Sequence, residues 1–193
     1  SDIRWDPMTG TVKTGVPLAL SFVVHRLDDG VCAPLAGAVV DVWHTDAVGV
    51  YSDVSREGTA GVKHLRGYQV TDDDGMARFT TVFPGWYSGR AIHIHFKIRV
   101  FSGDEEAYDF TSQLFFEEAT IAQVLTEPPY NTKGAADTPN ANDNIYRSGG
   151  DELLLAAVAS GEGLASTFEI ALVGVPQTGG GSAPAIGSVT VKR

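Results

Sequence analysis

The chain has 193 residues, of which 43% are hydrophobic and 20% are charged, and its formal net charge at pH 7 is −10. This length and composition are those of one globular domain whose core is large enough to be stable without disulfides. The acidic balance argues against binding to nucleic acid or to an anionic membrane, because no basic patch would neutralise phosphates. No apolar run has the length of a membrane-spanning helix. The single cysteine, Cys32, excludes an internal disulfide and a cysteine-based metal site.

Six segments in the first two thirds of the chain have the β-branched or alternating character of strands. They are residues 17–24, 38–45, 68–71, 76–82, 92–100 and 110–116. The acidic turn 72–75 indicates a hairpin, and its spacing does not fit the twelve-residue calcium loop. A loop rich in turn residues runs from residue 46 to about 65 and contains Tyr51.

Residues 117–125 are the best helix candidate, because a pair of glutamates opens the segment, apolar residues share one face, and Pro128-Pro129 ends it. A polar loop is expected to follow over 129–150, and a final hairpin over 152–158 and 166–175. Many short strands with one short helix predict a mainly β fold, a β-sandwich with long active-site loops.

The domain is expected to span residues 1–177. The Gly- and Ser-rich tail 178–193 resembles a linker that could lead to a further module.

The strand at 92–100 carries the most unusual combination of side chains. Residues i and i+2 of a strand lie on one face, so His93 and His95 point together while Ile94 and Phe96 point to the other face. The turn at Pro84-Gly85 would present Tyr87 nearby. Such a pair of histidines suits a metal site, although a half-buried sheet face could also carry it.

Several motifs, taken in order, resemble the intradiol ring-cleavage dioxygenases. Leu35 to His44, followed by Gly49-Val50-Tyr51-Ser52, resembles their first iron-ligand region. Phe83-Pro84-Gly85-Trp86-Tyr87, followed by Arg90-Ala91-Ile92-His93-Ile94-His95-Phe96, resembles the second. Two later strands, Thr111 to Phe116 and Phe168-Glu169-Ile170, also resemble that family. The resemblance covers roughly residues 16 to 175, and the motifs are specific only in combination.

The resemblance implies a non-haem iron(III) held by Tyr51, Tyr87, His93 and His95. The donor types agree with this metal, because phenolates are hard anionic donors that favour a hard trivalent cation. Two tyrosinates and one hydroxide would balance the charge of ferric iron, with both histidines neutral. Such a neutral centre could be buried without a large desolvation penalty.

The family's mechanism would then use a catechol and O2. The catechol would bind as a dianion in place of the hydroxide and Tyr87, while Tyr51 stays. Cleavage between the two hydroxylated carbons would yield a muconate-type dicarboxylic acid. Arg90 would stabilise negative charge on the ring, and Gln113 would help to orient the substrate. Without the resemblance, Arg90 would be interpreted as a surface salt bridge and Gln113 as a polar residue on a sheet face.

The remaining histidines and tyrosines are weaker candidates. His44 is expected to be structural or to lie behind the ligands, and His25 and His64 are expected at the surface. Four other tyrosines could substitute for Tyr51, because only the motif places it near the histidines. They are Tyr68, Tyr108, Tyr130 and Tyr146.

Two departures from the better-known members matter. Only Ser88 and Gly89 separate Tyr87 from Arg90, which predicts a more open pocket for substituted catechols. No helical segment of the kind that dimerises the catechol-type enzymes is expected either, because Val16 enters the first expected strand almost at once. This shorter form resembles a secreted bacterial subgroup, some members of which carry carbohydrate-binding modules, and so predicts a secreted enzyme.

Two other kinds of protein could carry some of these residues. A cupin-type metal site usually adds a glutamate shortly after the His-x-His pair and a later histidine, and the chain has no histidine after His95. A non-catalytic β-sandwich module that binds carbohydrate or an aromatic ligand could use the tryptophans and tyrosines as stacking faces. It does not explain why Tyr87 and Arg90 accompany the two histidines.

Overall fold

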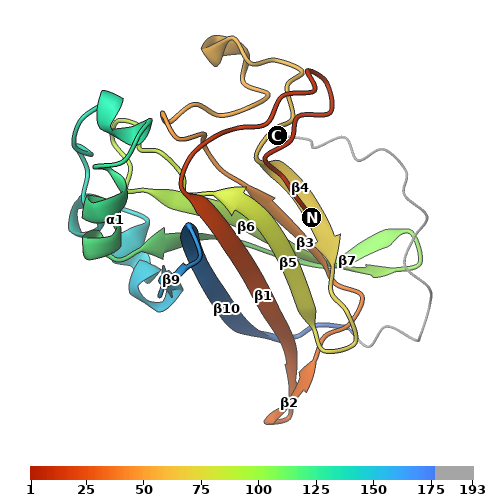
Figure 1. Ribbon diagram of the computed structural model, residues 1–193. Helices are drawn as coiled ribbons and strands as arrows, with labels where there is room; N and C mark the ends of the chain where they lie inside the picture. Colours follow the sequence, from red (N-terminus) through yellow and green to blue (C-terminus); the bar gives the residue numbers. More distant parts are fainter. Residues whose placement is uncertain (177–193) are drawn as a thin grey trace.

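The computed structural model describes residues 1–176, in which two β-sheets pack face to face (Figure 1). One sheet has the order β2-β1-β10-β9, with β5 also pairing with β1. Its strands are β1 (Pro17–Asp28), β2 (Val31–Pro34), β5 (Met76–Val82), β9 (Val158–Ser160) and β10 (Gly163–Val173). The other sheet has the order β4-β3-β6-β7-β8. Its strands are β3 (Val39–Trp43), β4 (Arg66–Val70), β6 (His93–Ser102), β7 (Glu105–Phe116) and β8 (Leu154–Leu155).

A cluster of phenylalanines joins the two sheets. The Phe22 ring of β1 lies 5.4 Å from the Phe96 ring of β6, and Phe168 of β10 lies 5.6 Å from Phe96, between ring centroids. Phe79 of β5 packs edge-on against Phe22. All four side chains are buried, so each sheet is fixed to the other by rings that bury large apolar surfaces.

Strand β6 shows why the functional residues face outward. Its buried residues alternate, with Ile94, Phe96 and Ile98 in the core and His95 and Lys97 partly exposed on the opposite face. This is the alternation expected of a strand with one face on the core. His93 and His95 therefore lie on the outer face of the second sheet, not between the sheets.

The mainly β sandwich is confirmed, and residues 1–176 contain one α-helix, α1 (Glu118–Val124). The predicted 129–150 loop contains short 3₁₀ turns, and a further one lies in the loop that follows Tyr51. They are Ser55–Glu57, Tyr130–Thr132, Asn140–Asn142, Tyr146–Ser148 and Gly150–Leu153. The predicted tail 178–193 lies outside the described residues.

The predicted final hairpin is wrong in its first arm. β10 pairs antiparallel with the short β9, whereas Leu154 and Leu155 form β8, which pairs in parallel with the end of β7. The prediction failed because a short apolar run does not reveal its partner. β7 also begins earlier than predicted, at Glu105, directly after a tight turn from β6.

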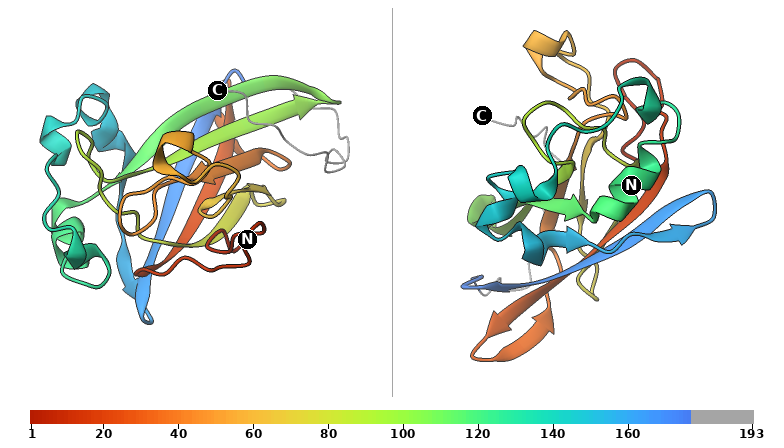
Figure 2. Two further views of the ribbon diagram at one scale, coloured as in Figure 1. Left: turned by 90° about the horizontal axis from the view of Figure 1, so that it is seen from above. Right: turned by 90° about the vertical axis from the view of Figure 1, so that its left-hand side faces the viewer.

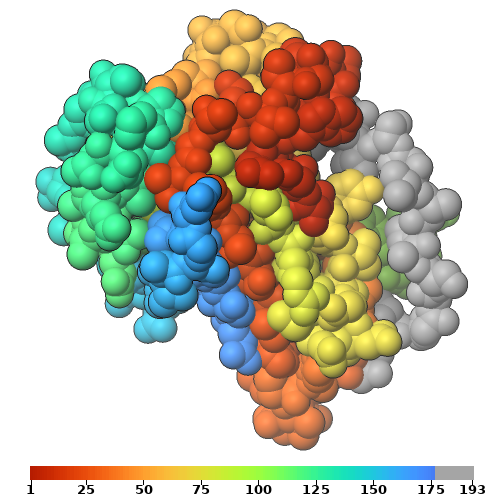
Figure 3. All heavy atoms as spheres, in the orientation of Figure 1, coloured from red at the N-terminus to blue at the C-terminus, as the bar shows by residue number. Residues whose placement is uncertain are grey.

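Long loops gather at one end of the second sheet. The N-terminal arm (residues 1–16) and the loop with the 3₁₀ turn Ser55–Glu57 lie together at the top of Figure 1, and Figure 3 shows them in contact. Seen from above, the loop of residues 83–92 lies between this region and the chain that follows α1 (Figure 2). These loops place side chains over the outward-facing histidines.

Candidate metal centre

Four donor atoms from three segments converge at the start of β6. His93 Nε2 lies 3.2 Å from Tyr51 Oη, 3.4 Å from Tyr87 Oη and 3.1 Å from His95 Nε2. The Tyr51 and Tyr87 rings meet edge to face with centroids 5.6 Å apart. The structure therefore brings together all four residues that the sequence predicts as ligands.

These separations fit a shared metal ion. Donors about 2.0–2.2 Å from one transition metal, at angles of about 90–110°, lie about 2.8–3.6 Å from each other. Each of the three separations from His93 Nε2 falls in this range. Among residues 1–176, no group of three or more His, Cys, Asp and Glu side chains could hold a metal. The two phenols are therefore essential to the donor set, and their hardness favours a trivalent cation.

Both imidazoles are prepared to act as neutral ligands. His93 Nδ1 lies 2.7 Å from the carbonyl oxygen of Ala91, which assigns the proton to Nδ1 and leaves the Nε2 lone pair facing the site. Burial lowers the pKa of His93 to about 4. Burial, with the neighbouring His93 and Arg90, lowers the pKa of His95 to about 3. Burial and the nearby Tyr87 raise the pKa of the Tyr51 phenol, so its ionisation requires a bound cation.

The neighbouring strands fix His95 on both sides. In the sheet register, Trp43 of β3 and Gln113 of β7 are its direct partners. The Trp43 ring stacks on the His95 ring, with centroids 4.9 Å apart and planes 1° from parallel. Strand pairing thus sets the orientation of His95 before any metal binds.

The loop that carries Tyr51 holds that residue by its main chain. Tyr51 N–H donates to Glu57 Oε2 at 2.7 Å, and Thr59 Oγ1–H donates to the Tyr51 carbonyl at 2.6 Å. The Arg66 guanidinium donates to Ser52 and lies 6.0 Å from the centre of the Tyr51 ring. Tyr51 is therefore oriented from both of its peptide groups.

Arg90 reaches the site between Tyr87 and Gln113. Its Nη1 donates to Tyr87 Oη at 3.4 Å, and its Nη2 donates to Gln113 Oε1. Its Nε donates to Asp143 Oδ2 at 2.7 Å, and this carboxylate is 1% exposed. The guanidinium is therefore a positive group directed at Tyr87, the ligand predicted to leave, and at Gln113, predicted to orient the substrate.

Sequence reasoning missed Asp143. Its Oδ2 also accepts the Ala91 N–H at 2.9 Å, and its Oδ1 accepts the N–H groups of Ile145 and Tyr146. Burial opposes its charge, yet Arg90 and these three N–H donors lower the pKa of Asp143 to about 2. Only its position in a polar loop was visible in the sequence, so no local pattern could have identified it.

The other histidines take structural places. His44 is buried, with Nδ1 2.7 Å from the Thr45 carbonyl and Nε2 2.7 Å from Thr81 Oγ1. The expectation that His64 lies at the surface is wrong: it is 3% exposed, beside the fully buried Asp6. The N-terminal arm covers it, which the sequence pattern did not reveal. His25 is half-buried beside Glu169.

The tyrosines considered as substitutes for Tyr51 lie elsewhere. Tyr130 is buried, and its hydroxyl donates to the Phe83 carbonyl at 2.7 Å. Tyr146 packs edge-on against Phe115. Tyr68 lies in β4 and Tyr108 in β7, beside the core.

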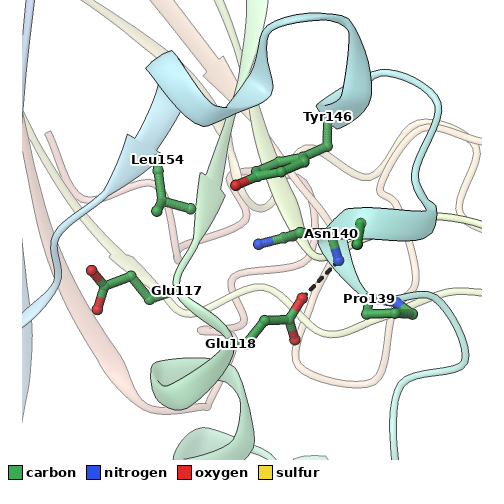
Figure 4. Close-up of a pocket in the computed structure, with 7 residues that line it drawn as sticks. Glu117, Glu118, Pro139, Asn140, Tyr146 and Leu154 are labelled. Carbon is green, nitrogen blue, oxygen red and sulfur yellow. Dashed lines mark hydrogen bonds between the residues drawn. The ribbon is translucent and has the colours of Figure 1, made fainter.

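A cavity of about 520 Å³ lies outside the donor cluster (Figure 4). It is lined by Glu117, Glu118, Pro139, Asn140, Ala141, Tyr146 and Leu154. None of these residues belongs to the four donors or to the Arg90 and Gln113 pair. The cavity lies between the start of α1 and the loop that carries Asp143, and it is not the candidate metal centre.

The fold and the site together define a β-sandwich protein with a centre of two tyrosines and two histidines. The "Dioxygenase" family model matches residues 7–128. This chain belongs to the intradiol ring-cleavage dioxygenase family.

Individual relatives agree with this assignment. A chlorocatechol 1,2-dioxygenase of Pseudomonas putida is 32% identical over 102 residues, 43% of this chain and 36% of that protein. The chain thus matches little more than a third of that relative's length. An intradiol ring-cleavage dioxygenase from Tetranychus urticae has a TM-score of 0.76 at 26% identity, and covers 92% of this chain and 88% of its own.

A third relative is the dioxygenase domain of a fusion with a carbohydrate-binding protein from a cellulolytic Streptomyces. Its TM-score is 0.60 at 29% identity, and the match covers 83% of this chain and 82% of that one. Among the residues described here, no helix is long and apolar enough to cross a membrane.

Proposed function

We propose that the protein is an iron(III)-dependent dioxygenase that cleaves catecholic rings between the two hydroxylated carbons. One observation carries this proposal: two phenol oxygens and the imidazole nitrogen of His95 lie 3.1–3.4 Å from His93 Nε2. Among common protein-bound metals, a donor set with two phenolates suits ferric iron best. Family membership supports the same metal and the same reaction.

The residues of the centre would have different roles in this reaction. Tyr51, Tyr87, His93 and His95 would hold the iron, which would activate a bound catechol toward dioxygen. Tyr87 as a phenolate would accept, at its Oη, one of the two protons that the catechol releases. Arg90 lies within hydrogen-bond distance of that oxygen, so its positive charge would stabilise negative charge on the reacting ring.

Gln113 and His95 would hold the substrate side of the site in place. Gln113 is the direct strand partner of His95 and accepts a hydrogen bond from Arg90. It would therefore orient Arg90 and the substrate together. The product of cleavage would be a muconate-type dicarboxylic acid. Only Ser88 and Gly89 separate Tyr87 from Arg90, and this short connection supports a site open to substituted catechols.

The alternative of a non-catalytic binding module explains less. It accounts for exposed aromatic residues but gives no reason for four donor atoms around one point or for the ion pair of the partly exposed Arg90 with the buried Asp143. We also infer a secreted protein with an appended carbohydrate-binding module. The fused Streptomyces relative supports this inference, and detection of the protein in the culture medium of its source would test it.

The first test is a visible absorption spectrum of the purified protein with metal analysis of the same sample. We expect a broad tyrosinate-to-iron charge-transfer band that shifts when catechol is added without oxygen. Oxygen uptake with catechol and the absorbance of the product would then establish ring cleavage. A protein that stays colourless after reconstitution with iron would refute the dioxygenase and favour the binding module.

A further inference from the structure

Residues 133–143, here named the 133–143 segment, lie alongside the loop of residues 83–92 that carries Tyr87 and Arg90 (Figure 2). The match to the family model ends at residue 128, so the comparison gives this segment no role. It nevertheless contacts the loop from Trp86 to Ala91, as the following hydrogen bonds show. Its two ends contact different parts of the candidate metal centre.

The first end joins the two loops that carry the tyrosines. Lys133 Nζ donates to the Val48 carbonyl at 3.0 Å and to the Trp86 carbonyl at 2.7 Å. It also lies 4.4 Å from the centre of the Trp86 ring, a favourable cation–π contact. Trp86 immediately precedes Tyr87, and Val48 lies three residues before Tyr51. One ammonium group therefore joins the two loops that carry the tyrosine ligands.

Gly49 lets these two loops approach closely. A Cβ atom at this position would lie 1.9 Å from the Trp86 carbonyl oxygen, and the φ angle of Gly49 is 82°. A side chain would force the loops apart and would strain the backbone. The ammonium group of Lys133 thus bridges two loops that already touch.

The middle of the segment continues the contact. Trp86 Nε1–H donates to the Gly134 carbonyl at 3.0 Å, and the Gly89 N–H donates to Asp137 Oδ1 at 3.2 Å. At the second end, Asp143 holds the Arg90 side chain and the Ala91 main chain through one carboxylate oxygen. This end touches Arg90 but none of the four donor side chains.

The segment is itself supported from behind. Asn140 N–H donates to Glu118 Oε1 at 2.7 Å, and Asn140 Nδ2–H donates to the Phe116 carbonyl at 2.8 Å. Figure 4 shows the first of these bonds across the cavity between α1 and the segment. A segment anchored on its far side can impose its position on the loop in front of it.

We propose that the 133–143 segment positions two functions of the centre separately. Lys133 sets the relative placement of the two tyrosine ligands, and Asp143 sets the orientation of Arg90. This inference rests on the proposed iron-dependent function and names positioning residues for it. If the inference is correct, substitutions at Lys133 and at Asp143 must change different measured properties of the protein.

The test compares two pairs of variants with the wild-type protein. Lys133→Met removes the bridging ammonium group, and Lys133→Arg keeps a cation with several donors. Asp143→Asn and Asp143→Glu alter the carboxylate that holds Arg90. Arg78→Met is the control, because this exposed arginine pairs with Asp72 far from the centre. Iron affinity by chelator competition, the charge-transfer band, kcat and KM are measured for each, after circular dichroism has confirmed folding.

For Lys133→Met we expect iron affinity to fall about tenfold and the charge-transfer band to shift, with most of both restored in Lys133→Arg. For Asp143→Asn we expect iron affinity close to that of the wild-type protein and a smaller band shift than in Lys133→Met, because Arg90 contacts Tyr87 Oη, with kcat reduced roughly tenfold to a hundredfold. Asp143→Glu, which keeps the charge but displaces it, should behave in the same way and replaces Asp143→Asn if that variant does not fold.

A double-mutant cycle supplies the second measurement. If Asp143 acts through Arg90, Asp143→Asn adds no further loss of kcat in an Arg90→Gln background. Equal effects of both ends on iron binding, or full additivity in the cycle, would overturn the proposal. A wild-type protein that has no iron band or cleaves no catechol would instead refute the proposed function, so the two failures are distinguishable.

Discussion

Trp43 and His95 lie face to face, with ring planes 1° from parallel and centroids 4.9 Å apart. They are direct partners across β3 and β6, so the strand register itself places the indole against the imidazole. The stacked ring limits rotation of His95 about its side-chain bonds. Folding therefore orients this ligand in advance, so metal binding does not have to supply the free energy of ordering it.

Replacing Trp43 should weaken metal binding without removing any ligand. For Trp43→Leu we expect iron affinity to fall about tenfold, because a support behind a ligand is typically worth that much or more. Chelator competition measures it. Trp5→Leu is the matched control, since Trp5 is 49% exposed on the N-terminal arm. Equal iron affinity in both variants would show that stacking does not orient His95.

Variants of the four donor residues should differ from one another in visible spectrum and in metal content. We expect Tyr51→Phe and Tyr87→Phe each to change the charge-transfer band, since each removes one phenolate donor. His95→Ala should lose iron altogether, because its Nε2 lies 3.1 Å from that of His93 and completes the donor set. Metal analysis and visible spectra check these outcomes. Full iron occupancy in His95→Ala would contradict the site.

Local rules in the sequence place three of the four donors near one another. Alternation along one strand puts His93 and His95 together whatever the tertiary structure, and the turn before Tyr87 is marked by Pro84-Gly85. Tyr51 came only from the family resemblance, since 42 residues separate it from His93.

What the sequence could not show depends on contacts between distant residues. Asp143 lies 53 residues from Arg90 in a polar loop without periodicity. His64 is buried by Asp6, 58 residues away. The parallel pairing of β1 with β10 joins the first strand of the chain to the last strand of the described residues. None of these contacts leaves a pattern within a short window of sequence.

His44 should make stability depend on pH. Burial lowers its pKa from 6.5 to about 4 in the folded protein, so below pH 6.5 the unfolded chain binds the proton more readily. The stabilisation is fully present above pH 6.5 and is lost as pH falls toward 4, by up to about 1.4 kcal/mol per pH unit.

Urea unfolding of the iron-free protein at about pH 7.5 and about pH 5 measures this loss. His44→Asn, which does not titrate, should lose less stability over this range than the wild-type protein. An equal loss of stability in both proteins would show that His44 is not the group that causes this pH dependence.

Glu57 should support the metal through the main chain of Tyr51. Its carboxylate accepts the Tyr51 N–H at 2.7 Å, so Glu57→Ala leaves that N–H without its partner and frees the loop to move. We expect iron affinity to fall about tenfold and the charge-transfer band to shift, because the angle of the phenolate at the metal changes. Glu57→Gln keeps an acceptor oxygen and should retain most of the affinity. Ser55→Ala, at an exposed side chain in the same turn, is the matched control. If Glu57→Ala and Ser55→Ala bind iron equally well, Tyr51 is oriented without help from Glu57, and the 2.6 Å bond from Thr59 to the Tyr51 carbonyl must be sufficient.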